Sequence, residues 1–142
     1  MPGCVLRVGS KTANVEALVK ASGLQPIVIH RKGFPRVPGG TALSPTSSFN
    51  VDVCGDGPIE QQASDAVAFL KHHARQLARL RRDRRFGGME LDFGLYDRRT
   101  AERPWPSYRL PASLIQLAGK HRIEIVLSMY SAPKNAANKT DG

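Results

Sequence analysis

A helical repeat of apolar residues between Pro58 and Arg85 is the longest regular pattern in the chain. Its apolar positions recur at alternating spacings of four and three residues, which places them on one side of an α-helix. These positions are Ala63, Val67, Leu70, Ala74 and Leu77. Pro58 suits a first helical turn, and Gly87-Gly88 can adopt the left-handed conformation that caps a helix. The pattern predicts one continuous helix that ends at this glycine pair.

Five other segments alternate apolar and polar residues or are rich in β-branched residues, as half-buried strands are. They cover residues 4–8, 27–30, 49–54, 89–96 and 123–130. In the last of them we expect Ile123, Ile125, Leu127 and Met129 to form the buried side. Two shorter helices are predicted, one capped by Asn14 or Thr12 and stopped by Gly23, the other running from Pro111 to Ala118.

The order strand, helix, strand, strand, helix, strand, helix, strand indicates the fold class. Because one face of nearly every strand is apolar, the helices should cover one side of a single sheet. We predict an α+β two-layer sandwich with a mostly antiparallel five-stranded sheet and three helices on one face. Residues 1–130 form the single domain, residues 37–47 form a surface loop, and residues 131–142 are expected to be a disordered tail.

Composition fits a folded domain without a cofactor. The hydrophobic content of 41% is in the globular range, and no apolar run approaches membrane-spanning length. The two cysteines, Cys4 and Cys54, have no CxxC partner, which fits a reducing cytoplasm. His72 and His73 are adjacent, so they diverge around a helix and do not make a zinc pair. We expect no metal and no cofactor.

The net charge of +9 is concentrated in one stretch. Residues 71–85 hold seven basic residues against Asp83, a local charge of +6, which leaves +3 for the other 127 residues. Lys71, Arg75, Arg79 and Arg82 would share one side of the long helix and could bind nucleic acid. A solvated helix face is the commoner reason for such a run, and arginines also suit the negative end of a helix dipole.

Three stretches resemble those of a known family. They are Val5-Leu6-Arg7-Val8 with the helix after it, Gly23-Leu24-Gln25-Pro26 leading to His30-Arg31-Lys32-Gly33, and the run from Leu110 to Tyr130. Together they resemble the bacterial family called domain of unknown function 4279. The sequence departs from that family at Pro111, where a capping hydroxyl is common, and in its more basic long helix. The resemblance implies a small bacterial cytoplasmic α+β domain and lends no activity.

Several carboxylates should share the polar face of the sheet. Strand alternation points Asp52, Glu90, Asp92, Tyr96, Glu124, Ser128 and Tyr130 the same way. Clustered carboxylates could bind Mg²⁺ or Ca²⁺, or raise one another's pKa for acid–base catalysis. An uncovered sheet face is hydrophilic in any case, and no spacing here is diagnostic of a metal loop. We prefer the interpretation that these side chains only make an uncovered sheet face hydrophilic.

The basic run at the end of the second strand is a candidate binding site. His30, Arg31, Lys32 and Arg36 could hold a phosphate or an acidic segment of a partner. Basic side chains also protect a sheet edge from unwanted pairing, and we favour the binding role only because the family resemblance includes this run. Trp105, between two prolines, could stack on a base or anchor a partner, although such a residue more often folds back over its own core.

Three hypotheses of function follow, in order of preference. The first is a non-enzymatic interaction module, for example of an immunity type, that docks another protein or a second copy through a charged face. The second is nucleic-acid binding by the basic helix, and the third is metal-assisted hydrolysis on the carboxylate face. No nucleophile elbow, phosphate-binding glycine loop or dinucleotide fingerprint is present in the sequence.

Overall fold

A computed structural model describes residues 3–131 of the chain. The elements follow one another as β1 (Cys4–Ser10), α1 (Val15–Ser22), β2 (Val28–His30), β3 (Ser47–Cys54), α2 (Ile59–His72), α3 (Ala74–Arg82), β4 (Phe86–Asp97), α4 (Ala112–Lys120) and β5 (Ile123–Ser131). The expected disordered tail lies outside the described residues, apart from Ser131, which ends β5. Between Gly3 and Ser131, no helix is both long and apolar enough to cross a membrane.

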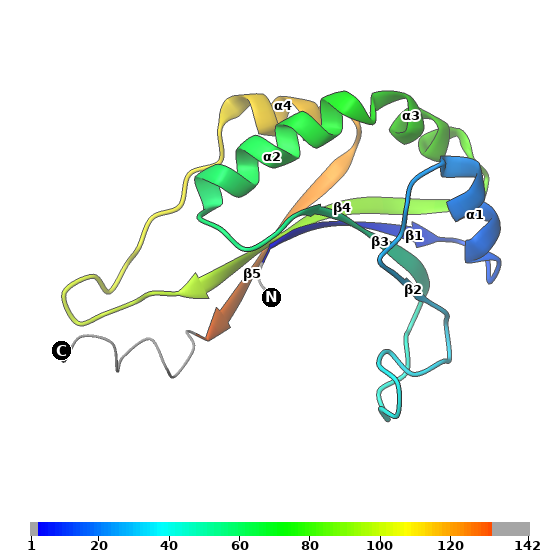
Figure 1. Cartoon of the computed structure of the whole chain (residues 1–142), viewed down its shortest axis with the longest axis horizontal. Helices are drawn as coiled ribbons and strands as arrows, with labels where there is room; N and C mark the ends of the chain where they lie inside the picture. Colours follow the sequence, from blue (N-terminus) through cyan, green and yellow to red (C-terminus); the bar gives the residue numbers. More distant parts are fainter. Residues whose placement is uncertain (1–2, 132–142) are drawn as a thin grey trace.

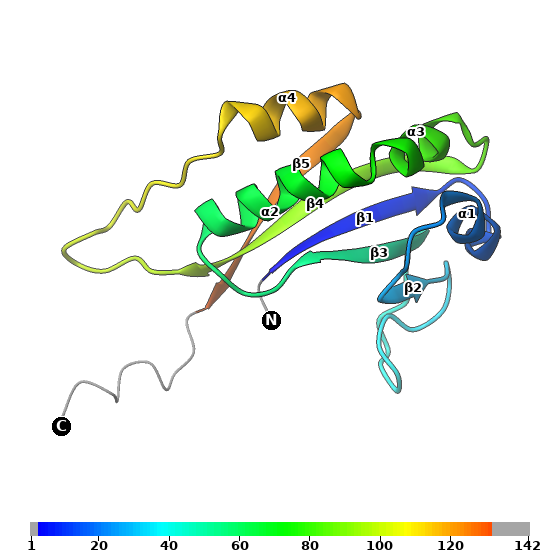
Figure 2. The same ribbon diagram turned by 45° about the horizontal axis from the view of Figure 1, so that its top comes forward.

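The five strands form one sheet in the order β2-β3-β1-β4-β5. The pairings β2–β3, β3–β1 and β1–β4 are antiparallel, and only β4–β5 is parallel, with α4 as the crossover between them. All four helices lie on one side of the sheet, and the other side is open (Figure 1; Figure 2). The predicted two-layer α+β architecture, with its mostly antiparallel sheet, is confirmed.

The core lies between the sheet and the helices. The side chains that alternate toward the helices on the central strands are fully buried, among them Leu6, Phe49, Leu91 and Phe93. They pack with Leu18, Leu70, Leu77 and Leu114 from the helix layer. The period of two in the strands and the helical period therefore predicted the same interface, which is the interface that holds the two layers together.

The prediction of one long helix is wrong at its middle and at its end. His73 leaves the helical conformation, with φ −102° and ψ 19°, and separates α2 from α3. The predicted stripe nevertheless stays on the core side, since Ala63, Leu70 and Leu77 are buried while Val67 and Ala74 are half-buried. The break changes the direction of the chain, so that α3 contacts β4 and α1 (Figure 1). The apolar stripe thereby stays in contact with the sheet although the sheet twists.

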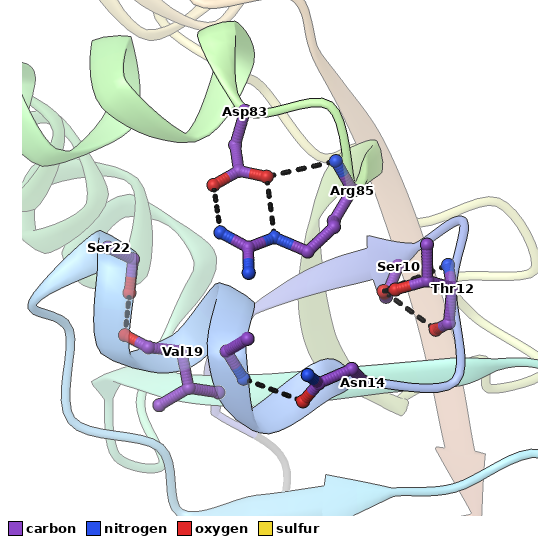
Figure 3. A network of polar contacts seen from close by, with 8 residues as sticks. Ser10, Thr12, Asn14, Val19, Ser22, Asp83 and Arg85 are labelled. Atoms are coloured by element: carbon purple, nitrogen blue, oxygen red, sulfur yellow. Dashed lines mark hydrogen bonds and ion pairs between the residues drawn. The ribbon is translucent and has the colours of Figure 1, made fainter.

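Helix α3 stops at Arg82 instead of at the glycine pair. Asp83 is extended, and its carboxylate accepts hydrogen bonds from the backbone N–H and the guanidinium of Arg85 (Figure 3). Gly87 and Gly88 instead follow Phe86 at the start of β4, where the pairing with β1 shifts register between Gly9 and Ser10. Gly88 has φ 131°, a conformation that side-chain-bearing residues rarely adopt, so the glycine pair forms a β-bulge and not a helix cap.

Two further predictions about burial are wrong. Leu127 and Met129, expected on the buried side of the last strand, are 45% and 51% exposed, because β5 is an edge strand that runs past the helices above it. Trp105, expected to cover the core, is 87% exposed. It lies in the loop between β4 and α4, where the flanking prolines keep the backbone out of any helix or strand.

Helix α1 and the loop after β2 are held by local hydrogen bonds. Asn14 caps α1 as predicted, accepting from the N–H of Ala17, and the Ser22 hydroxyl donates to the carbonyl of Val19 near Gly23 (Figure 3). Most of residues 37–47, the expected surface loop, are exposed, although Ser44 and Ser47 are buried. The segment 31–46 folds back on itself. A β-bridge joins Pro35 to Leu43, with hydrogen bonds on either side, so we call this segment the 31–46 hairpin.

Candidate functional site

The open face of the sheet carries the side chains that alternate away from the helices. The strand register aligns Val28, Asn50, Arg7, Glu90 and Glu124 in one row across all five strands. The row beside it aligns His30, Ser48, Gly9 and Gly88. The first row is polar or charged over four strands, and the second contains three of the smallest residues in the chain.

The carboxylates predicted on this face are partly neutralised by an arginine between them. Arg7 on β1 contacts Glu90 with 3.3 Å between Nη1 and Oε1, and Asp92 with 2.7 Å between Nη2 and Oδ2. The hydroxyl of Ser128 on β5 donates to the other oxygen of Asp92, at 2.6 Å. Asp92 is thereby only 4% exposed, although no helix covers it. This group ties three strands together and is part of the framework below the site.

Beside this group the open face is hollowed to a volume of about 600 Å³, which we call the sheet hollow. The sheet forms a low floor there because Gly9 and Gly88 have no side chain and Ser48 has a small one. Val37, Ser44 and Thr46 from the 31–46 hairpin line it on one side. Arg122 and Glu124, at the start of β5, line it as well. The hollow thus exists because the sheet has small residues next to the 31–46 hairpin, which forms a wall on one side.

Two polar atoms in the lining of the sheet hollow are buried and unpartnered. The hydroxyl of Ser44, a residue that is 4% exposed, has no hydrogen-bond partner. The side-chain carbonyl oxygen of Asn50 also has none. Among the described residues, only one other buried side-chain atom has this status, the amide oxygen of Gln62 in the core. Both atoms of the lining are closed to solvent, so they lie beneath the surface of the hollow and do not by themselves identify a ligand.

The predicted basic run divides between two places. His30 and Arg36 line the sheet hollow, as predicted for a binding site. Arg31 instead forms an ion pair with Glu16 of α1, and the backbone N–H of Lys32 donates to the hydroxyl of Ser47. The exposed side chain of Lys32 is not among those that line the hollow. Only the residues at the two ends of the run therefore converge.

Arg122 is a member of the site that the sequence interpretation missed. It is the only residue other than glycine with a positive φ in the described part of the chain, at 56°. That conformation costs a side-chain-bearing residue about 1–2 kcal/mol, so the turn before β5 would accept glycine more readily. Arg36 and Arg122 form no ion pair with another residue between Gly3 and Ser131, and both residues are exposed.

The other predicted acidic-face residues lie on the same face but outside the hollow, except for Glu90 and Glu124, which line it. These outer residues are Asp52, Tyr96 and Tyr130. In the described range 3–131, no three His, Cys, Asp or Glu side chains are grouped so that they could hold a metal ion. The carboxylates share a surface, as expected, but the contacts of two of them are made with Arg7.

The basic helix residues lie in the helix layer, away from the hollow. Arg75, Arg79 and Arg82 are exposed on α3, and none of them forms an ion pair with a described residue. Lys71 is at the end of α2, on the other side of the break at His73. The four residues predicted to share one helical side are therefore divided between two helices.

Three apolar side chains of the 31–46 hairpin are exposed beside the hollow. Phe34 and Val37 are each 61% exposed, and Leu43 is comparable. Val37 is also part of the hollow's lining. The surface around the polar hollow is therefore amphipathic, with a basic rim and an apolar hairpin.

Comparisons with known proteins matched the chain to no protein family, no curated protein and no solved structure.

Proposed function

We propose that the chain is a non-enzymatic interaction module whose open sheet face docks a segment of another protein. The observation that carries this proposal is the sheet hollow, which is lined by Arg36 and Arg122 without an ion pair to another described residue and by the exposed Val37 of the 31–46 hairpin. An occupant with an anionic group could make charge-assisted hydrogen bonds to these guanidinium groups.

A protein segment fits this surface better than a small polar molecule does. Val37 lines the hollow, and Phe34 and Leu43 of the same hairpin are also exposed. Exposed apolar side chains near polar groups are typical of protein–protein interaction sites, where aromatic residues act as anchors. The partner should therefore offer apolar side chains next to the polar group that enters the hollow.

The polar group is expected to be a carboxylate. Among the charged residues that line the hollow, Arg7 is already paired with Glu90 and Asp92. Arg36 and Arg122 remain as basic groups without an ion pair, and Glu124 opposes them. Because Arg7 neutralises only one of its two carboxylates, these six groups sum to a net charge of zero, and the two free guanidinium groups are what favours an anion. A guanidinium at each of two places can bind a carboxylate with charge-assisted hydrogen bonds. We infer that the partner segment carries Asp or Glu beside apolar residues.

Selection from a random peptide library tests the proposal. The library is panned on the wild-type chain, and selected peptides are measured by calorimetry against two double variants. Arg36→Ala with Arg122→Gly removes the basic groups of the hollow and also relieves the positive φ at residue 122. Arg75→Ala with Arg79→Ala removes the same two charges from α3, so both variants change the net charge from +9 to +7.

We expect selected peptides to be acidic and apolar. The hollow variant should bind them about tenfold or more weakly, and the α3 variant should bind within about twofold of the wild type. Equal losses in both variants would mean that only net charge is recognised. No selected peptide, or peptides unaffected by the hollow variant, would also contradict the proposal.

Nucleic-acid binding is the second candidate, favoured by the three exposed arginines of α3 that lack ion pairs with described residues. In that case Arg75→Ala with Arg79→Ala should make duplex binding less dependent on salt. The slope of log K against log salt should become shallower by about 0.9 for each phosphate that the variant no longer neutralises. The hollow variant should change that slope little.

A cytoplasmic location, bacterial origin, the family resemblance and an immunity-type role remain part of the first proposal, that of an interaction module.

A further inference from the structure

The two edges of the sheet are protected very differently. The edge strand β2 has three residues, follows Pro26 and continues into Arg31 and Lys32, and each of these features discourages pairing with another strand. The opposite edge strand, β5, has nine residues from Ile123 to Ser131. It contains no proline or lysine, and its single charged residue is Glu124.

The unprotected edge is also apolar on its surface. Leu127 and Met129, on the helix side of β5, are exposed, and so is Tyr130 on its open side. Ile115 of α4, which contacts β5, is exposed too, at 53%. It lies about 200° around the helix from Leu117, which packs against the core, so it is on the other flank of α4. Exposed apolar side chains therefore occur both on the strand and on the helix that contacts it.

We propose that β5 pairs antiparallel with β5 of a second copy of this chain, about a twofold axis at Leu127. This pairing would join the two five-stranded sheets edge to edge. This dimer goes beyond the proposed docking at the sheet hollow. The two proposals share only Glu124, which lines the hollow and would also face Tyr130 of the second copy on the open side of the sheet.

A second copy is the occupant because the strand is self-complementary. In a register centred on Leu127, all nine residues of β5 find a partner. On the helix side Leu127 meets Leu127, and Ile125 meets Met129, so apolar side chains face apolar side chains. On the open side Glu124 meets the second copy's Tyr130, and the two glutamates stay apart. The same twofold axis keeps both helix layers on one side of the joined sheet.

Sedimentation at a series of protein concentrations tests the pairing. The wild-type chain should form a dimer that dissociates on dilution, and added salt should strengthen it because each copy carries a net charge of +9. Leu127→Lys puts two ammonium groups opposite each other at the axis and should raise the dissociation constant about tenfold or more. Leu43→Lys, at another exposed leucine far from β5 in the sheet order, should leave it unchanged.

Two substitutions at Tyr130 test the register. Tyr130→Glu would place a carboxylate opposite the second copy's Glu124 and should weaken the dimer about fivefold or more, whereas Tyr130→Lys should keep or strengthen it. Met129→Lys, at a residue that is 51% exposed, replaces Leu127→Lys if that variant loses its circular dichroism spectrum.

Some outcomes would overturn the proposal. These are a wild type that stays monomeric up to millimolar concentration, a dimer that survives both lysine variants of β5, or a dimer that Leu43→Lys breaks equally. Equal effects of the two Tyr130 variants would overturn the register and the twofold axis. Failure of peptide binding at the hollow would leave these measurements unaffected, so the two proposals fail separately.

Discussion

At the scale of single residues, Gln62 shows how a buried polar side chain can hold two elements together. It lies in α2, is 1% exposed, and its amide nitrogen donates to the carbonyls of Gly57 and Gly94, both at 2.8 Å. Gln62→Leu leaves both carbonyls without that donor, so the free energy of unfolding should fall by about 1–3 kcal/mol. Urea denaturation measures the change.

The neighbouring Gln61 is the matched control for this prediction. It is exposed and donates to Asp65 one turn later, an interaction worth a few tenths of a kcal/mol. Gln61→Leu should therefore change the stability by less than about 0.5 kcal/mol. Equal effects of the two substitutions would contradict the structural role of the Gln62 amide.

His121 should make the stability depend on pH. Burial, followed by the nearby charges of Arg81 and Lys120, holds the pKa of His121 below its usual range. Its Nδ1 lies 2.7 Å from Nη1 of Arg81 and can accept a hydrogen bond only when unprotonated. The unfolded chain therefore binds more protons than the folded chain at mildly acid pH, and the contribution of His121 is lost as pH falls from about 6.5 toward the lowered pKa.

Urea denaturation between pH 7.5 and 5 measures this loss. His121→Gln removes the titrating group, so the decline in stability on acidification should become shallower than in the wild type. His72→Gln replaces an exposed histidine of α2 and serves as the control. If both variants keep the wild-type pH profile, His121 does not account for it.

At the scale of the elements, substitution in the glycine pair can test whether these residues form a β-bulge in β4 and not a helix cap. Gly88→Ala forces a side chain into φ 131° and should cost about 1–3 kcal/mol. Gly119, by contrast, is helical in α4 and has open space where a Cβ would be, so Gly119→Ala should stabilise by about 0.5–1 kcal/mol. A glycine that merely capped a helix would also resist substitution, but it would leave the protection of the neighbouring β1 amides from hydrogen exchange unchanged. We expect Gly88→Ala to lower that protection.

Much of the element pattern could be predicted because hydrophobic periods are local. Strand alternation gave the faces of β1, β3 and β4, and the capping residues Asn14 and Gly23 bounded α1. The break at His73 could not be predicted, because the stripe on either side of it keeps the same period. The exposure of Leu127 depends on β5 being an edge strand, and strand order is a property of the whole sheet.

The site was predicted less well for the same reason. His30, Arg36, Glu90 and Glu124 were identified, and they converge on one hollow. Arg7 carried a usable signal, since alternation places it on the polar side of β1, next to strands that bear carboxylates. Alternation placed Asn50 on the polar face of β3 but did not distinguish it from its neighbours, and Ser44 carried no signal because it lies in a segment without a predicted element. Arg122 looked like one more basic residue until its backbone conformation was known.

At the scale of the whole molecule, the basic groups are divided between the two faces. Arg75, Arg79 and Arg82 belong to the helix layer, whereas Arg36 and Arg122 border the hollow on the open face. The carboxylates of Glu90 and Asp92 are shared with Arg7, so the open face is less acidic than its sequence indicates. The chain is therefore not simply acidic on one side and basic on the other, and its selectivity should come from the hollow's geometry more than from its overall field.

The two proposals together predict bivalent binding. A twofold axis through β5 that keeps both helix layers on one side also keeps both open faces on the other, so two hollows would face the same surface. On a dense layer of an immobilised hollow-binding peptide, the wild type should dissociate about tenfold or more slowly than the monomeric Leu127→Lys variant. In solution, the affinity per site of the two proteins should agree within about twofold, because residue 127 does not line the hollow. Equal dissociation from dense and sparse layers would contradict the shared orientation even if the dimer itself forms, since binding through two sites requires that both can reach the layer at once.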